Sequence, residues 1–399
     1  MIQAFAARCG MMSLALTAFA TLLLSACAPS VPYGLPSGRS LPPPATGTQI
    51  PAEGEVIGTG DIRVALLLPL SAEGNGAQVA AEMKNAAQLA LEHSGLDALE
   101  LVIKDTGGTE AGAAAAAQSA ARERAALVLG PLFAANVRAA GSVLAPQGIT
   151  TIAFSSDRSV AAPGIYLNSY LPEGLVRRII SHAASRGLKK VVAIVPNGPA
   201  GDIDENVARA TLESAGGSLL AVTRYDYDNA SMQRAVQEAA LAAHEADAIF
   251  LPDGGNSPSA IVAALRTLGI DLSGKRLLGT GQWASVNLSD PALQGAWFSD
   301  TDHARMNRYW MFYRQRFGRE PSVTSALAYD SVILAATLAR RGEAALTQAS
   351  LQAPTGFAGA TGAFRFLPDG TTERGYAVYE VIDGAARLIS PAPTSFTGT

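Results

Sequence analysis

The chain has 399 residues, 48% of them hydrophobic and 6% aromatic, and its formal net charge is −4. This mildly acidic balance lacks the basic patch that a nucleic-acid-binding protein needs, so we expect no nucleic-acid partner. Both cysteines, Cys9 and Cys27, lie near the N-terminus, which excludes a disulfide or a cysteine-ligated metal from the folded part of the chain.

The N-terminal segment predicts export. An apolar stretch over residues 11–24 is too short to span a bilayer but has the length of a signal-peptide core. It runs into LSAC at 24–27, which resembles the lipobox of bacterial lipoproteins. That resemblance implies a signal peptide over residues 1–26 and a lipid on Cys27, and therefore a periplasmic protein anchored to a membrane, the outer in preference to the inner. The alternative is an ordinary secretory signal with an incidental cysteine.

The following segment predicts a tether. Residues 28–60 are rich in proline, with glycine and serine between the prolines. Such a composition cannot bury enough apolar surface to offset the entropy lost on ordering. We therefore expect residues 27–60 to be a lipid-bearing tether, and residues 391–399 to be a tail.

Strand and helix patterns alternate from residue 61 onward. Short apolar runs, typical of buried parallel strands, are separated by longer segments with helical patterns. The alternation pauses at 168–174 and resumes, which predicts an α/β fold with two doubly wound parallel sheets. The expected strands are 62–69, 99–104, 127–129, 150–154, 190–195, 219–224, 248–251 and 276–279; the expected helices are 77–93, 110–124, 134–144, 175–186, 204–214, 231–244, 260–268, 304–316 and 322–341; and 363–366 with 377–382 is expected to form a hairpin.

The loops that follow these strands predict a ligand-binding cleft. Ligands of open α/β sheets bind beyond the carboxyl ends of the strands. Ser155 and Ser156 are the favoured contacts, with turn capping as the alternative, and Trp283 is expected to stack on a ligand or partner, with packing as the alternative. The candidate cleft residues are Ser71, Leu132, Phe133, Ser155, Ser156, Asn197, Tyr225, Asp253, Gln282 and Trp283.

The sequence contains no convincing motif for catalysis or for cofactor binding. Residues 269–275 have the spacing of a phosphate-binding loop but join a helix to a strand, and no convincing helix follows the glycines at 279–284. Asp202, Asp204 and Glu205 could hold a metal, although acids at a helix N-terminus are the simpler interpretation. No nucleophile–base pair can be assembled from the motifs, so we expect neither an enzyme nor a cofactor nor a metal site.

Three long segments resemble type I periplasmic binding proteins of the leucine/isoleucine/valine-binding kind. They are IRVALLLPLSAEGNGAQVAAEMKNAAQLAL, GPLFAANVRAAGSVLAPQGITTIAFSS and KKVVAIVPNGPAGD. The resemblance implies two discontinuous lobes joined by a hinge of three crossing segments. The expected first lobe is 61–168 plus 296–341, and the expected second lobe is 169–295 plus 342–390.

Two further segments resemble the penicillin-binding-protein activator lipoproteins. They are LLGTGQWASVNLSDPALQGAWFSD and GFAGATGAFRFLPDGTTERGYAVYEV. This resemblance implies a non-catalytic lipoprotein that stimulates a peptidoglycan synthase by contact. The amino-acid-binding relatives are also expected to offer hydroxyl groups to a ligand carboxylate at the positions of Ala134 and Asp157, and neither residue here supplies one.

Two functional hypotheses therefore remain. The leading hypothesis is an activator of a penicillin-binding protein, to which the long tether and the departures at Ala134 and Asp157 both point. The alternative is a solute-binding receptor that delivers an amino acid or another small polar ligand to an ABC permease.

Overall fold

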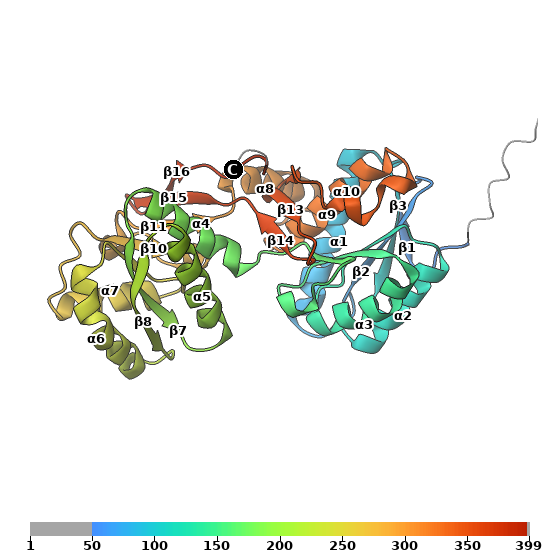
Figure 1. The fold of residues 1–399 in the computed structure, drawn as a ribbon. Coiled ribbons are helices and arrows are strands. Elements are labelled where there is room, and N and C mark those ends of the chain that lie inside the picture. The colour runs from blue at the N-terminus through green and yellow to red at the C-terminus, as the bar shows by residue number, and fades with distance from the viewer. Residues whose placement is uncertain (1–49, 397–399) are drawn as a thin grey trace, which may run out of the picture. The chain divides into compact units, whose positions relative to one another are not determined.

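The computed structural model describes residues 50–396 (Figure 1). The predicted signal peptide, the predicted lipidation site Cys27 and the predicted tether as far as residue 49 lie outside the described residues. Within the part of the chain that the structure describes, no helix is both long enough and apolar enough to cross a membrane.

The first sheet has six strands in the order β1-β3-β2-β4-β5-β6. Its strands are parallel except for β1, which pairs antiparallel with β3. Alternate side chains of its fully buried central strand enter cores on opposite faces: Leu66 packs towards α1 and α9, and Leu67 packs towards α2 and α3. The bounds are β1 Glu55–Ile57, β2 Arg63–Leu68, β3 Glu100–Asp105, β4 Leu127–Leu129, β5 Thr150–Ala153, β6 Ile165–Leu167, α1 Asn75–Ser94, α2 Glu110–Arg122, α3 Ala134–Leu144 and α9 Ser325–Ala339.

The second sheet has seven strands in the order β16-β15-β11-β10-β9-β7-β8. Strands β7 to β11 are parallel, and an antiparallel pair, β15 and β16, extends the sheet beyond β11. Helices α4 and α5 cover one face, and α6 and α7 cover the other. The bounds are β7 Lys190–Pro196, β8 Ser218–Tyr225, β9 Ala248–Phe250, β10 Arg276–Gly279, β11 Trp297–Asp300, β15 Ala377–Ile382, β16 Ala385–Ser390, α4 Pro172–Ser185, α5 Pro199–Ser214, α6 Asn229–Glu245 and α7 Ser257–Thr267.

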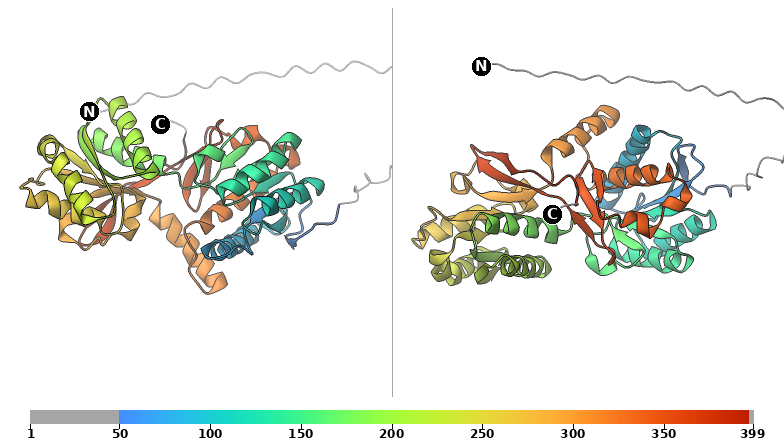
Figure 2. Two further views of the ribbon diagram at one scale, coloured as in Figure 1. Left: turned by 90° about the horizontal axis from the view of Figure 1, so that it is seen from below. Right: turned by 45° about the horizontal axis from the view of Figure 1, so that its top comes forward.

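Two further helices and a small sheet pack beside the first sheet. Helix α8, His303–Phe317, lies beside α1 (Figure 2). Tyr309 and Tyr313 of α8 enter an apolar cluster that α1 shares. A small antiparallel sheet contributes Phe364 and Phe366 to the core of the first sheet. This small sheet consists of β12 Phe357–Gly359, β13 Gly362–Phe366 and β14 Thr372–Arg374, and α10 Gln348–Leu351 precedes it; the short 3-10 helices are Ala145–Gln147, Arg158–Val160, Gly281–Ser285, Pro291–Leu293 and Glu343–Ala345.

The predicted α/β class with two doubly wound sheets is confirmed, but the chain changes sheets at other points than expected. The expected returns lay at residues 296 and 342. In the structure β11 still belongs to the second sheet, because it pairs with both β10 and β15. Residues 343–374 stay with the first sheet, because Leu346 and Leu351 pack in its core. The crossings therefore fall after β6, after β11 and after β14.

Three local predictions also differ from the structure. The expected hairpin of 363–366 with 377–382 is wrong, because β13 pairs with β12 and β14, whereas β15 pairs with β11 and β16. Residues 55–57 fell within the expected tether but form β1, which is held by a hydrogen bond from buried Lys104 to the carbonyl of Glu53 (2.7 Å). Phe396 of the expected tail is buried and lies under the guanidinium of Arg365.

Candidate functional site

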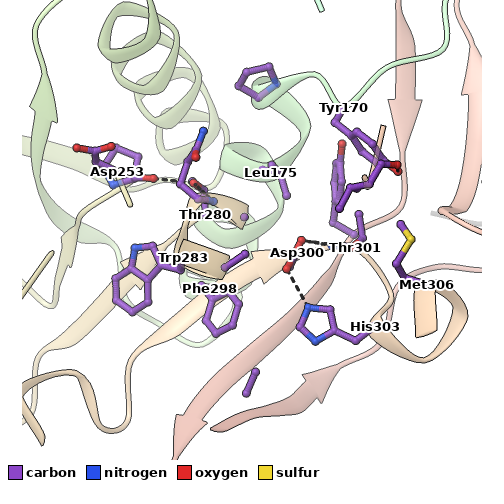
Figure 3. Close-up of a pocket in the computed structure, with 18 of the residues that line it drawn as sticks. Tyr170, Leu175, Asp253, Thr280, Trp283, Phe298, Asp300, Thr301, His303 and Met306 are labelled. Atoms are coloured by element: carbon purple, nitrogen blue, oxygen red, sulfur yellow. Dashed lines mark hydrogen bonds and ion pairs between the residues drawn. The ribbon is translucent and has the colours of Figure 1, made fainter. Parts of the chain in front are cut away.

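A cavity of about 810 Å³ lies at the carboxyl ends of the parallel strands of the second sheet. All five of these strands send a following loop to its wall, as expected for an open α/β sheet. Helix α8 and the three chain crossings complete the wall (Figure 3). The polar and aromatic lining residues are Tyr170, Asp204, Tyr227, Asp253, Thr280, Gln282, Trp283, Phe298, Asp300, Thr301, His303, Asn307, Trp310 and Tyr376.

Asp253 follows β9 and is held by two donors. The hydroxyl of Tyr225 donates to Asp253 Oδ2 (2.8 Å), and the backbone N–H of Gly254 donates to Oδ1 (2.8 Å). Tyr225 itself is fully buried beneath the carboxylate. Burial, followed by the charge and hydrogen bond of Asp253, raises the pKa of Tyr225 far above its usual value, so Tyr225 stays protonated and acts as a donor.

Asp204 lies in the second turn of α5, only 8% exposed, and lines the same cavity. The helix can approach the end of β7 this closely because Gly201 has no side chain; a Cβ there would lie 1.9 Å from the carbonyl oxygen of Pro196. Burial, followed by the charges of Asp253 and Glu173, raises the pKa of Asp204 to about 7. Asp204 is thus a buried carboxylate that titrates near neutrality.

A second acid, Asp300, ends β11 on the other side of the cavity. Its Oδ2 lies 2.8 Å from Nε2 of His303, and its Oδ1 accepts from the backbone N–H of Thr301 (2.7 Å). The His303 ring stacks on Tyr379 with 4.1 Å between the centroids, and its backbone N–H donates to the Tyr379 hydroxyl. Both oxygens of Asp300 are therefore satisfied within the protein (Figure 3).

Aromatic side chains form much of the remaining wall. Tyr227 is 75% exposed at the mouth, whereas Tyr376 is almost fully buried and packs against Gly174, where a Cβ would lie 2.7 Å from the ring. Burial raises the pKa of Tyr376 to about 12. Trp310 reaches the wall from α8, and its buried indole N–H has no hydrogen-bond partner among residues 50–396.

Trp283 supports the cavity from within the core. It is fully buried, its indole N–H donates to the carbonyl of Leu251 (2.9 Å), and its ring stacks on Phe298. Gly279 makes room for it, since a Cβ at this position would lie 2.3 Å from the indole. Of the two interpretations given from the sequence, this geometry favours packing over stacking on a ligand.

The predicted cleft residues divide between the two sheets. Asp253, Gln282 and Trp283 line the cavity, Tyr225 lies beneath it, and Asn197 donates to Asp226 in a neighbouring exposed loop (2.8 Å). The predicted residues of the first sheet do not line this cavity, and a role for them in ligand contact stays a prediction. These are Ser71, Leu132, Phe133, Ser155 and Ser156.

The first-sheet loops satisfy much of their polarity locally. The hydroxyl of Ser155 accepts from the backbone N–H of Asp157 (3.1 Å), as in the turn-capping interpretation. The Asp157 carboxylate in turn accepts from the backbone of Ser159 (2.9 Å) and pairs with Arg138 (3.3 Å). The phenyl ring of Phe133 lies over Gly76.

Several lining residues were not predicted as cleft residues. Asp204 was considered only for a metal or a helix terminus, and among the described residues no group of three or more His, Cys, Asp and Glu side chains is placed to hold a metal ion. Asp300 and His303 were missed because β11 was not recognised as a strand. Tyr376 was missed because its segment was expected to belong to a hairpin.

Comparisons with known proteins agree with this architecture. A putative branched-chain amino acid ABC transporter protein from Rhodospirillum rubrum has a TM-score of 0.72 at 21% identity, covering 82% of this chain and 99% of its own. A leucine-binding protein from Thermotoga maritima has a TM-score of 0.53 at 18% identity, covering 82% and 98%. A substrate-binding protein from Desulfitobacterium hafniense in complex with Leu has a TM-score of 0.58 at 18% identity, covering 82% and 99%.

At these identities the structural neighbours establish the fold alone. No curated protein matches the sequence. The model of the family described as "Periplasmic binding protein", however, matches residues 61–386, which is most of the chain and includes every residue named above for the cavity. The protein belongs to the periplasmic binding protein family.

Proposed function

We propose that the protein is a non-catalytic, periplasmic solute-binding receptor that captures a small ligand and delivers it to an ABC permease. The cavity at the carboxyl ends of the second sheet carries this proposal. Its volume of about 810 Å³ falls in the range usual for small-molecule sites, and its wall combines apolar surface with a few convergent polar groups.

The position of the cavity supports the same function. Each of the three crossings contributes a lining residue: Tyr170 from the first, Thr301 from the second and Tyr376 from the third. The cavity is therefore bounded by every segment that connects the two sheets. Differential contacts with such segments are what allow a ligand to bias a conformational equilibrium that a permease could recognise.

The comparisons support the receptor more than the activator of a penicillin-binding protein, which was the leading hypothesis from the sequence. The neighbouring structures named above are described as transporter or ligand-binding proteins. Residues 277–300, one of the segments that resembled the activators, supply part of the cavity wall. Activation of a penicillin-binding protein is thus the alternative function, and the experiment below distinguishes it from the receptor.

The test uses purified full-length protein in a thermal-shift screen of amino acids, carboxylic acids and amines. A true ligand at a hundredfold excess over its Kd should stabilise the protein by about 2.7 kcal/mol through mass action. Affinity capture from cell envelopes should then retrieve a permease. A screen without any stabilising compound, together with capture of a glycan polymerase, would refute the receptor and favour the activator.

The membrane anchor is a separate proposal. We infer a lipid on Cys27 from the LSAC segment at 24–27. Mass spectrometry of the mature N-terminus should show an acylated cysteine, and Cys27→Ser should release the protein into the soluble fraction. An unmodified wild-type Cys27 would contradict the anchor without affecting the receptor.

A further inference from the structure

The acids of the cavity outnumber the basic side chains that line it, of which the described part of the chain supplies one, His303. Asp204, Asp253 and Asp300 all line it, and within the described part of the chain no lysine or arginine does. Asp253 and Asp300 each have both carboxylate oxygens engaged by donors of the protein. Their charges are therefore partly satisfied before any ligand arrives.

Asp204 differs from both. It is 8% exposed, yet among residues 50–396 its carboxylate makes no hydrogen bond and no ion pair. Its charged neighbours are the acids Asp253, from the loop after β9, and Glu173, from the first turn of α4. A buried carboxylate is normally paired, because removing its charge from water without compensation is costly. The partner that this site lacks is a cation.

We propose that the cavity binds an organic amine, and that its protonated nitrogen lies between the carboxylates of Asp204 and Asp253. This inference rests on the proposed receptor function and specifies its class of ligand. A ligand whose charge is a carboxylate would meet three acids and, among the described lining residues, no lysine or arginine; the lining histidine, His303, already pairs with Asp300.

The aromatic wall fits the same ligand. Tyr227 lines the cavity close to Asp253, and its ring packs edge-on against Tyr225 with 6.0 Å between the centroids. Trp310 and Tyr376 provide further ring surface. Aromatic faces attract cations, and they cover the hydrocarbon part of an amine without adding a second charge. The carboxylates and the rings together form a site for a cationic head with an apolar body.

Amine binding should depend on pH through Asp204. Only the ionised carboxylate pairs with the amine, and burial together with Asp253 and Glu173 raises the Asp204 pKa to about 7. Below that pH the ligand must displace a proton. Affinity should therefore fall by about tenfold per pH unit, or about 100-fold between pH 8.5 and pH 5.

The experiment compares ligands that share a hydrocarbon side chain and differ in their charged groups. Isothermal titration calorimetry on the full-length protein uses 3-methylbutylamine, leucine and 4-methylpentanoate as one trio, and 2-phenylethylamine, phenylalanine and 3-phenylpropanoate as another. We expect the amine to bind at least about tenfold more tightly than the zwitterion or the anion in a trio that binds. Asp204→Asn should remove about tenfold or more of the amine affinity and most of its pH dependence.

Asp202→Asn is the matched control. Asp202 lies on the same helix two residues away, but it is exposed and pairs with Arg224 (2.9 Å), so its replacement should leave amine affinity unchanged. If a zwitterion or an anion binds as tightly as its amine, the amine proposal falls while the receptor stands. If Asp202→Asn and Asp204→Asn weaken binding equally, the assignment of the cation to Asp204 falls. If neither trio nor the wider screen gives binding, the amine proposal falls; if the envelope capture then retrieves a glycan polymerase, the receptor falls with it.

Discussion

Replacing Asp204 with Asn should stabilise the unliganded protein, by an amount that grows with pH. The folded carboxyl has a pKa of about 7, whereas the ordinary value is 3.8. Between these pH values the folded state holds a proton that the unfolded chain has released. The wild-type free energy of unfolding therefore decreases as pH rises through this window, and it changes no further from this group above pH 7.

The size of the effect follows from the pKa shift. Each pKa unit corresponds to about 1.4 kcal/mol. The interval from pH 5 to pH 7 covers two pH units below the folded pKa of Asp204. The free energy of unfolding of the wild type should therefore decrease by at most about 3 kcal/mol over this interval because of Asp204. Water that enters the cavity screens the charges of Asp253 and Glu173 from Asp204, so we expect a change of about 1–3 kcal/mol. The Asn variant has no such loss, because its amide does not ionise.

Urea denaturation at pH 5 and pH 8.5 measures this difference. The gap in unfolding free energy between Asp204→Asn and the wild type should widen at the higher pH, with the denaturant slope unchanged. Asp202→Asn should show no widening, because Asp202 is exposed and paired with Arg224. If the gap between Asp204→Asn and the wild type is equal at the two pH values, the carboxylate is not the uncompensated charge that the cavity geometry implies.

Three further changes test the scaffold around the site, each by urea denaturation. Lys104→Met removes the nearer cation of buried Glu123 (2.8 Å; both side chains under 5% exposed) and leaves it with the more distant Arg63 (4.0 Å), which should cost about 3 kcal/mol. Unchanged stability would contradict the buried pair. Gly279→Ala should lower the free energy of unfolding by about 1–3 kcal/mol, because the new methyl group would clash with the Trp283 ring. It should also alter the fluorescence of Trp283, and an unaltered spectrum would argue against this contact. Burial and two nearby arginines lower the pKa of His182 to about 4, so the free energy of unfolding of the wild type decreases as pH falls from 6.5 towards 4. Between pH 6.5 and pH 5 this free energy should decrease by about 2 kcal/mol less in His182→Gln than in the wild type. Equal decreases in the two proteins would refute this.

The alternation of strands and helices could be predicted because the physics of parallel sheets is local in sequence. A strand such as β2, buried on both faces, needs an uninterrupted apolar run, and the crossover helix that follows needs a helical pattern. The antiparallel pairing of β11 with β15 could not be predicted from a local sequence pattern of this kind. β11 has only four residues, and its partner β15 lies far along the chain, so their pairing depends on tertiary contacts.

The candidate site was predictable only in part, for a related reason. Loops after strands in the same sheet converge at one edge, which is why Asp253 and Gln282 were found from their positions alone. Asp204 lies inside a helix, where an acid is ordinary on a solvated face. Its burial depends on how closely α5 approaches β7, and that approach depends on Gly201. No pattern within α5 distinguishes it from Asp202 or Glu205.

The cavity also lies beside a hydrogen-bonded network at the crossings. Arg374 donates to the carbonyl of Ser169 (2.9 Å), to the hydroxyl of Thr361 (2.6 Å) and to the side chain of Asn168, so it ties the first and third crossings together. The Thr361 hydroxyl in turn donates to the buried carboxylate of Asp330.

This network fixes the chain on one side of the crossings. The residues next to it, Tyr170 and Tyr376, are the ones that line the cavity. Breaking a buried polar network costs more than rotating the short segments beside it. A ligand that contacts Tyr170 and Tyr376 therefore acts on the short segments beside the network, whose backbone can rotate without breaking it. A binding protein needs its ligand at such a position if a partner is to sense that the site is occupied.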